Sequence, residues 1–356
     1  MNKHGGNIRL AAEEYNLNPK EIIDFSANIN PLGYPKGIGE IILDNLGAIS
    51  NYPDPENKIF KQALSEYLGI PAKNLLAGNG SMELIFLIAL ALKPKKTLIP
   101  VPAFSEYERA VQLTGSKIIF LQGTEKNNFK LDIGDLLKSL ASVDLVFICN
   151  PNNPTGFLFD KDSINALVKE CERLSVFLVI DEVFMDFVKD RDALSMLRHA
   201  AESRQVLVLR SLTKFFALAG LRLGYLAGNV TLLKKISSFQ PPWSVNAFAQ
   251  ITAAKIINDT GFIKKSRDYL FRVRADFYEE LKKIEFVKPY PPNANFIFCR
   301  LLDGRINSRK LFVHCANRGI LIRDCSNFRG LDDSFIRIAV RKEEENRKLI
   351  GILMEL

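Results

Sequence analysis

The sequence predicts an α/β protein with two lobes, a large one on a mostly parallel mixed sheet and a smaller α+β one at the C-terminal end. From about residue 75 to 230, short apolar runs of strand length alternate with amphipathic helical stretches. The runs between residues 145 and 211 are almost continuously apolar, which is typical of strands covered by helices on both faces. After residue 260 one long amphipathic stretch precedes several separate strand-like runs.

Each element can be placed in order along the chain. The first 40 or so residues lack strong periodicity, and we expect them to pack on the smaller lobe and across the cleft. In the large lobe we expect strands at residues 75–77, 96–99, 117–121, 145–149, 177–180, 205–211 and 223–227, with helices at 82–93, 104–114, 160–174 and 232–239. In the smaller lobe we expect helices at 261–284 and from 341 onward, with strands at 286–287, 296–300, 320–322 and 335–340. The predicted division is therefore 1–40, 41–250 and 251–356.

Length and composition narrow the class of protein. The 356 residues are 47% hydrophobic and 25% charged, as in ordinary folded proteins. The longest apolar run, residues 84–92, is about half of the ~20 residues that a membrane span requires. The N-terminus has no apolar signal-peptide core. We expect a cytoplasmic protein that does not bind membranes.

Charge and metal-binding residue types exclude two further classes. The net charge of +8 is spread along the chain without an aromatic–basic RNA signature, so we expect no nucleic-acid partner. The excess is typical of a solvated surface, and part of it could focus anionic small molecules into a cleft. Five scattered cysteines without a C-x-x-C pair predict reduced core residues. The three histidines do not pair with other ligands at metal-binding spacing, so no metal is expected.

Polar residues follow two of the predicted buried strands. Asp181 closes the apolar run 177–180, and a carboxylate at that place needs a cationic or hydrogen-bonded partner. Ligands bind at this end of open α/β sheets. The turn at residues 150–156 (N-P-N-N-P-T-G) predicts that the amides of Asn152 and Asn153 face a ligand. The alternatives are a helix-capping aspartate and a simple connector.

Two further stretches suit an anion and an amine. Glycines at residues 78–80, before the apolar helix, would expose backbone N–H groups to a phosphate, although glycine turns are common. Lys214 lies in the apolar segment S-L-T-K-F-F, where burial would disfavour its charged form and favour imine chemistry. Ser211 and Arg222 could clamp a phosphate nearby. The alternative is a surface lysine beside a helix start.

Taken together, these motifs resemble one family. Their order resembles that of the aspartate-aminotransferase-like enzymes of fold type I, which use pyridoxal 5'-phosphate (PLP). Within this family the chain resembles histidinol-phosphate aminotransferases, and most closely the threonine-phosphate decarboxylases of cobalamin biosynthesis. The segments that carry this likeness are residues 4–7 (H-G-G-N), 24–33 (D-F-S-A-N-I-N-P-L-G), 52–55 (Y-P-D-P), 241–247 (P-P-W-S-V-N-A) and 320–331.

The resemblance implies a role for each matching residue. Lys214 would hold PLP as a Schiff base, and Asp181 would pair with its ring nitrogen. The other cofactor-binding residues would be Asn153 at the phenolic oxygen, Phe104 on the ring face, and Ser81, Met82, Ser211, Arg222 and a second subunit's Tyr52 at the phosphate. The substrate would be bound by His4, Gly5, Asn28, Asn153, Arg323 and Arg337. Spacing alone does not distinguish Arg337 from Arg341, and only the motif favours Arg337.

The resemblance also implies the reaction. A homodimer would decarboxylate L-threonine O-3-phosphate to (R)-1-aminopropan-2-yl phosphate and CO₂, for the aminopropanol linker of cobalamin. One alternative is the same reaction on L-serine O-phosphate, since a single methyl group changes binding by only ~1–3 kcal/mol. Another is an aminotransferase of the histidinol-phosphate type. A PLP-binding regulator without catalysis is the alternative from a different class, and the complete set of site residues disfavours it.

Overall fold

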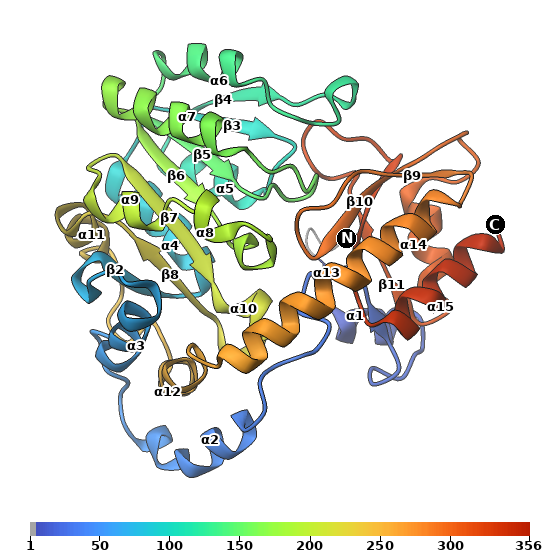
Figure 1. Ribbon diagram of the computed structural model, residues 1–356, viewed down its shortest axis with the longest axis horizontal. Coiled ribbons are helices and arrows are strands. Elements are labelled where there is room, and N and C mark those ends of the chain that lie inside the picture. Colours follow the sequence, from blue (N-terminus) through green and yellow to red (C-terminus); the bar gives the residue numbers. More distant parts are fainter. Residues whose placement is uncertain (1–4) are drawn as a thin grey trace.

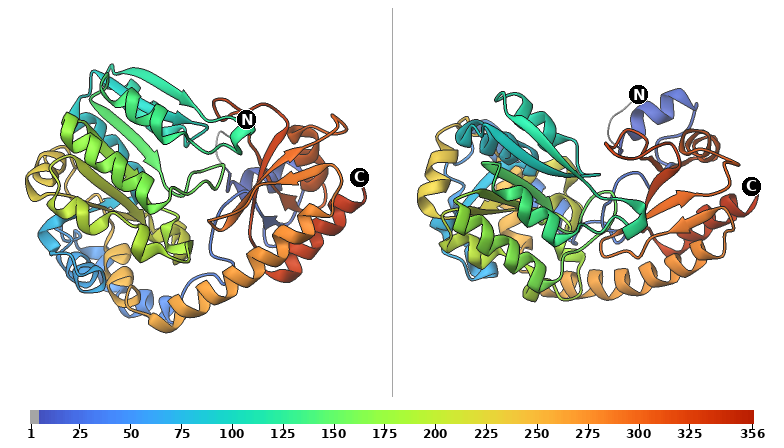
Figure 2. Two further views of the ribbon diagram at one scale, coloured as in Figure 1. Left: turned by 45° about the horizontal axis from the view of Figure 1, so that its top comes forward. Right: turned by 90° about the horizontal axis from the view of Figure 1, so that it is seen from above.

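The computed structural model describes residues 5–356, which form two lobes on either side of a cleft (Figure 1). A seven-stranded sheet lies at the centre of the large lobe, and a four-stranded sheet lies in the small lobe. The 23-residue helix α13 (Thr260–Lys282) runs along both lobes and connects them on one side of the cleft. Figure 2 shows the same helix spanning both lobes from two further directions.

The large sheet confirms the predicted mostly parallel, mixed topology. Its strands lie in the order β2-β8-β7-β6-β5-β3-β4, and only β8 runs antiparallel to its neighbours. The bounds are β2 (Leu75–Asn79), β3 (Lys96–Val101), β4 (Lys117–Gln122), β5 (Leu145–Cys149), β6 (Phe177–Asp181), β7 (Val206–Ser211) and β8 (Leu223–Ala227).

Helices cover both faces of this sheet, which explains its continuous apolar strands. Along β5, Val146 and Ile148 belong to one core cluster, whereas Leu145 and Phe147 belong to the other. The second core is closed by α4 (Gly80–Leu92), α5 (Glu106–Gln112) and α11 (Val230–Ser237). The first is closed by α6 (Ile133–Leu140), α7 (Lys161–Leu174) and α9 (Leu197–Glu202), among others. Successive side chains of each strand are therefore buried on opposite sides.

The small lobe combines an antiparallel sheet with the N-terminal segment. Its sheet has the order β12-β13-β10-β9, with β9 (Val287–Pro289), β10 (Phe296–Leu301), β12 (Arg323–Asp324) and β13 (Phe335–Ala339). Helices α14 (Ser308–Ala316) and α15 (Glu343–Met354) belong to the same lobe. Near the N-terminus, α1 (Ile8–Glu14) and β1 (Ile23–Asp24) lie against it, and β1 pairs in parallel with β11 (Ile320–Leu321).

The structure differs from the predicted elements in three respects. The strand expected at residues 320–322 is the two-residue β11, which bonds to β1, and an unexpected strand β12 follows at Arg323–Asp324 and bonds to β13 of a different sheet. The helix expected from residue 104 begins only at Glu106. Helices without a predicted counterpart are α1, α2 (Ile38–Asp44), α3 (Lys58–Leu68), α6, α8 (Arg191–Leu194), α9, α10 (Leu212–Phe215), α12 (Ala247–Ile256) and α14.

All five cysteines are buried free thiols, which confirms that they are core residues. Within residues 5–356, no helix has the length and apolar character needed to cross a membrane. The same residues contain no group of three or more potential metal ligands.

Candidate active site

A cavity of about 280 Å³ lies between the lobes, beside the carboxyl ends of the central strands. The large lobe and the small lobe each contribute part of its lining. The predicted site residues that line it are Gly5, Asn28, Ser81, Met82, Phe104, Asn153, Asp181, Lys214, Arg323 and Arg337. These residues are spread over more than 330 positions of the sequence, so the fold itself assembles the site.

Asp181 is the last residue of β6 and is buried at the base of the cavity. Burial raises the pKa of this carboxyl to about 6, although hydrogen bonds from Tyr107 and the Val183 amide act in the opposite direction. The Tyr107 hydroxyl donates to Oδ2 at 2.5 Å, and the Val183 amide donates to Oδ1 at 3.0 Å. Tyr107 itself is fixed by stacking on Phe147, with ring centroids 5.0 Å apart. Asp181 is therefore a rigid acceptor.

Tyr107 is a residue of the site that the sequence motifs did not indicate. Its ring also meets Phe104 edge-on at 5.7 Å, so it connects the expected stacking residue to the expected carboxylate. Burial and the nearby Asp181 raise the pKa of Tyr107, which keeps its hydroxyl protonated as a donor. The only signal in the sequence is a phenol three residues after Phe104, and this spacing does not reveal the Asp181 contact.

Lys214 lies in the short helix α10, immediately after β7, and its side chain reaches the cavity. Burial and, to a smaller extent, the positive charges of Arg337 and Arg222 lower the pKa of its amine to about 8. Asp24 and Asp181 oppose this shift. A substantial fraction of the amine is thus neutral near physiological pH, as an amine that attacks a carbonyl must be.

The first turn of α4 forms an anion cradle with Arg222. Gly80 has φ of +74°, and a Cβ there would lie 2.7 Å from the Arg222 guanidinium. A Cβ on Gly224 would lie 2.5 Å from the Ser81 amide nitrogen. Backbone N–H groups at the start of this 13-residue helix and a guanidinium therefore converge where no side chain fits between them. This donor set fits a phosphate group.

Ser211 lies behind that cradle and does not line the cavity. It is opposite Gly224 in the β7–β8 ladder. Its hydroxyl lies 2.7 Å from Thr213 Oγ1 and accepts from the Thr213 amide at 3.2 Å. In this arrangement Ser211 supports the turn that presents Lys214.

Asn153 and Arg337 are joined across the cavity. Arg337 donates through Nη1 to Asn153 Oδ1 and through Nη2 to the Ser26 carbonyl at 2.8 Å. With Oδ1 engaged, the donor half of the Asn153 amide is the part that can bind a ligand oxygen. The expectation for Asn152 is wrong, because its amide donates to Pro102 O at 2.9 Å and Thr155 Oγ1 at 2.8 Å. The proline-rich turn closes on itself through this side chain.

Two arginines face each other on the small-lobe side. Arg323 of β12 is the ladder partner of Arg337 of β13, and they are 8% and 6% exposed. Burial lowers the pKa of both guanidinium groups, that of Arg337 to about 10. Among residues 5–356 no ion pair involves Arg337. Two guanidinium groups side by side in the cavity lining make this wall suited to an anionic ligand.

The N-terminal segment completes this wall. Asn28 is buried, and its Oδ1 has no hydrogen-bond partner within the described part of the chain. A Cβ on Gly5 would lie 2.4 Å from Ser26 O, so only glycine fits there. Ser26 is held by Asp24, which accepts from its amide at 2.8 Å and its hydroxyl at 2.6 Å. Asp24 and Ser26 were missed as site residues although they lie in a motif that the sequence singled out.

The remaining predicted residues lie elsewhere. His4 lies outside the described residues. Tyr52 does not line the cavity of its own chain, is 80% exposed and stacks on Trp243 with ring centroids 4.5 Å apart. Arg341, the alternative to Arg337, donates to Glu345 at 3.0 Å and does not line the cavity. The structure thus distinguishes the two arginines that spacing alone did not.

Comparison with known proteins gives consistent matches over the whole chain. The model of the family described as "Aminotransferase class I and II" matches residues 20–353. A putative threonine-phosphate decarboxylase of Caldanaerobacter subterraneus subsp. tengcongensis is 38% identical over 99% of this chain and 94% of its own length. The threonine-phosphate decarboxylase of Salmonella typhimurium is 36% identical over 98% and 95%. Among solved structures, the histidinol-phosphate aminotransferase of Clostridium acetobutylicum superposes with a TM-score of 0.88 at 35% identity, over 94% of this chain and 98% of that one.

Proposed function

This chain belongs to the class I and II aminotransferase family, and we propose that it is a PLP-dependent decarboxylase of L-threonine O-3-phosphate. The products are (R)-1-aminopropan-2-yl phosphate, as for the aminopropanol linker of cobalamin, and CO₂. Both threonine-phosphate decarboxylase relatives span nearly the full chain. The arrangement of charges in the cavity supports the same reaction.

The cavity fits PLP at each of its functional groups. The anion cradle of α4 and Arg222 suits the phosphate, and Lys214 Nζ is available for a covalent bond to the aldehyde carbon. Asp181 suits the ring nitrogen, and the Asn153 amide suits the phenolic oxygen. When bound, PLP accepts the electron pair of a substrate bond to Cα that stands perpendicular to its ring.

One observation carries the substrate proposal, namely the facing pair Arg323 and Arg337. An amino acid with one carboxylate needs one guanidinium, whereas a phosphorylated amino acid carries a second and stronger anion. Arg323 lies beyond Arg337 on the small-lobe side and donates to Asp324 O at 2.7 Å and to Asn327 Oδ1 at 2.8 Å. We therefore assign the phosphate to the Arg323 side of the cavity.

Orientation of the substrate then selects the reaction. If the basic groups hold the phosphate, the carboxylate is not pinned in the ring plane and can stand perpendicular to it, so that CO₂ leaves. After CO₂ has left, Lys214 Nζ is the group on the cavity wall that can deliver a proton to Cα. Its pKa of about 8 allows both the neutral and the protonated form near neutral pH.

The decisive assay supplies threonine phosphate without any 2-oxoacid. We expect release of CO₂ and of aminopropanol phosphate from the PLP-loaded protein. Activity that appears only after 2-oxoglutarate is added would instead select a histidinol-phosphate-type aminotransferase, the alternative that the likeness to the Clostridium acetobutylicum structure favours. Serine phosphate should be tested in parallel. Equal kcat/KM on it would show that the methyl group is not recognised.

We also propose that the enzyme is a homodimer with shared active sites. Tyr52 does not line the cavity of its own chain and stacks on the exposed Trp243, and Leu43, Ile49 and Ile59, close to it in the sequence, are exposed as well. Covering such a patch is a typical reason for subunit association. In this dimer each chain's Tyr52 would reach the phosphate of its partner's cofactor, and sedimentation of a fully active monomer would contradict this. The five free thiols are consistent with the reducing cytoplasm as its location.

A further inference from the structure

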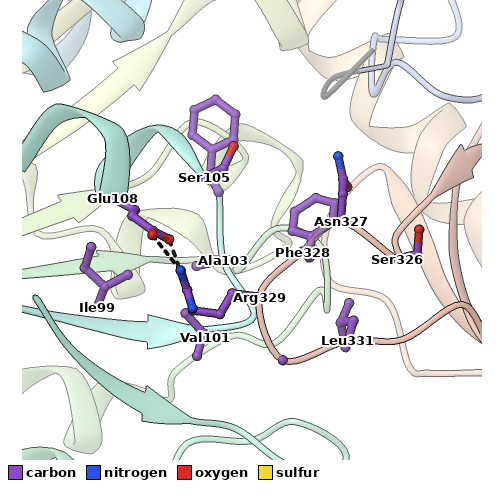
Figure 3. A pocket seen from close by; sticks show the side chains of 12 residues that line it. Ile99, Val101, Ala103, Ser105, Glu108, Ser326, Asn327, Phe328, Arg329 and Leu331 are labelled. Carbon is purple, nitrogen blue, oxygen red and sulfur yellow. Dashed lines mark hydrogen bonds and ion pairs between the residues drawn. The ribbon is translucent and has the colours of Figure 1, made fainter. Parts of the chain in front are cut away.

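Residues 326–331 of the small lobe, here called the clasp segment, reach across the cleft to the large lobe. Figure 3 shows Arg329 extending from this segment to Glu108 on α5. The contact is bidentate, with Arg329 Nε 3.1 Å from Glu108 Oε2 and Nη2 2.6 Å from Oε1. The same guanidinium lies over the Phe120 ring of β4, 4.2 Å from its centroid. The geometry fixes both the plane and the direction of this arginine.

A second contact fastens the clasp segment beside the ion pair. Gly330 has φ of +84°, and a Cβ there would lie 2.3 Å from the Gln122 side chain. Gln122 lies at the end of β4 and donates to Gly330 O at 3.4 Å. The chain therefore needs glycine at this position to approach the large lobe closely.

The other end of the clasp segment holds Arg323. Asn327 Oδ1 accepts from Arg323 Nη2 at 2.8 Å, and the Phe328 ring lies 5.0 Å from the Arg323 guanidinium carbon. The turn between them is compact, since the Phe328 amide donates to Cys325 O and the Leu331 amide to Phe328 O, each at 3.0 Å. A shift of Arg329 therefore displaces the residues that orient Arg323.

One residue of the clasp segment, Phe328, also lines the active-site cavity. A second cavity of about 370 Å³ lies between the segment and α5 (Figure 3). Phe104 and Phe328 line both cavities and so form the partition between them. One of these residues belongs to the predicted cofactor site and the other to the clasp segment. The partition is complete only while the two lobes are held together here.

We propose that Glu108 and Arg329 are positioning residues, which through Asn327 and Phe328 set the place of Arg323 and thereby the affinity for the substrate phosphate. This inference rests on the proposed function, in which Arg323 binds that phosphate. Neither Glu108 nor Arg329 lines the active-site cavity, so they act on the substrate only through Arg323. The pair matters for binding and not for the bond-breaking step.

The test is a double-mutant cycle with Glu108→Gln, Arg329→Gln and the double variant, all loaded with PLP. We expect each variant to raise KM for threonine phosphate about two- to fivefold, the range for an exposed ion pair, with kcat unchanged within about twofold. Calorimetry should show the Kd of inorganic phosphate rising by the same factor. The double variant should lose no more than either single variant, because all three break the same contact.

Two control variants sharpen this test. Arg173→Gln removes an exposed bidentate pair with Glu170 on α7 and should change neither constant. Lys288→Met weakens another contact between the lobes, to Glu125 at 3.1 Å, without touching the clasp segment. Unchanged phosphate affinity in the Glu108 and Arg329 variants, additive losses, or an equal effect of Lys288→Met would each overturn the proposal. If the wild-type enzyme does not decarboxylate threonine phosphate, the proposed function fails. The phosphate calorimetry still shows whether the Glu108–Arg329 contact controls the binding of phosphate.

Discussion

The two walls of the cleft are built in different ways. On the cofactor wall, Asp181 and Lys214 follow β6 and β7, which are neighbours in one sheet. On the substrate wall, Gly5, Arg323 and Arg337 come from the N-terminal segment and two strands of the small lobe. The first wall depends on a single buried sheet, whereas the second depends on segments brought together from both ends of the chain. Chemistry is therefore placed on the wall built from one sheet, and substrate selection on the wall assembled from separate segments.

The largest loss of activity is expected from a variant that disrupts the cofactor wall. Lys214→Ala removes the amine that binds PLP covalently and can return a proton to Cα, so kcat should fall by at least about a thousandfold. The absorption band of the bound cofactor should disappear, and borohydride should no longer fix PLP to the protein. A retained, reducible band would show that another lysine anchors the cofactor.

An intermediate loss of activity is expected from a variant that disrupts the substrate wall. Arg337→Gln removes a buried cation that holds both Asn153 and the Ser26 carbonyl, and kcat/KM should fall by about 30-fold or more. The cofactor band should persist, because Lys214 and the anion cradle remain. Arg341→Gln is the matched control, four residues further along the chain. Because Arg341 bonds to Glu345 and not to the site, kcat/KM should stay within about twofold of wild type. Equal losses in the two variants would contradict the assignment of Arg337.

The smallest expected effect is on the pH dependence of cofactor binding, because Arg337 of the substrate wall helps to lower the pKa of Lys214 on the cofactor wall. Burial, Arg337 and Arg222 lower the pKa of Lys214 to about 8, so its neutral form increases from pH 7 and saturates above pH 8. The rate at which cofactor-free protein binds PLP covalently should rise about tenfold from pH 7 to pH 9 and then level off. Stopped-flow absorption measures this rate. A rate still climbing tenfold per unit between pH 8 and pH 10 would indicate an ordinary lysine.

The sequence was a better guide to the cofactor wall than to the substrate wall, for a physical reason. Asp181 and Asn153 follow runs whose continuous apolar pattern marks strands buried on both faces, so their place at the sheet edge could be predicted. Tyr107 could not be identified in this way, because its role depends on how α5 packs over β6. The functions of Asp24 and Ser26 depend equally on contacts with residues more than 300 positions away.

The same limit explains the errors in the fold. Residues 320–322 form a continuous apolar run, but only Ile320 and Leu321 pair with β1, and from Arg323 the chain pairs with β13. Nothing local marks this change of partner. Asn152 and Asn153 are neighbours of the same type, and only the closed turn, with Asn152 bonded to Pro102 O, shows which of them can meet a ligand. Arg341 was excluded only by its contact with Glu345.

The pairing of β1 with β11 has a consequence for the newly made chain. Ile23 leaves the ribosome long before its partner Ile320, and at usual rates of synthesis the interval is about 15–60 s. During this time every strand of the large sheet has already emerged, so the cofactor wall can assemble first. Strand β1 of the N-terminal segment must wait for its partner β11. Chains that stop before residue 320 should therefore be able to bind the cofactor but lack Arg323 and Arg337 of the substrate wall.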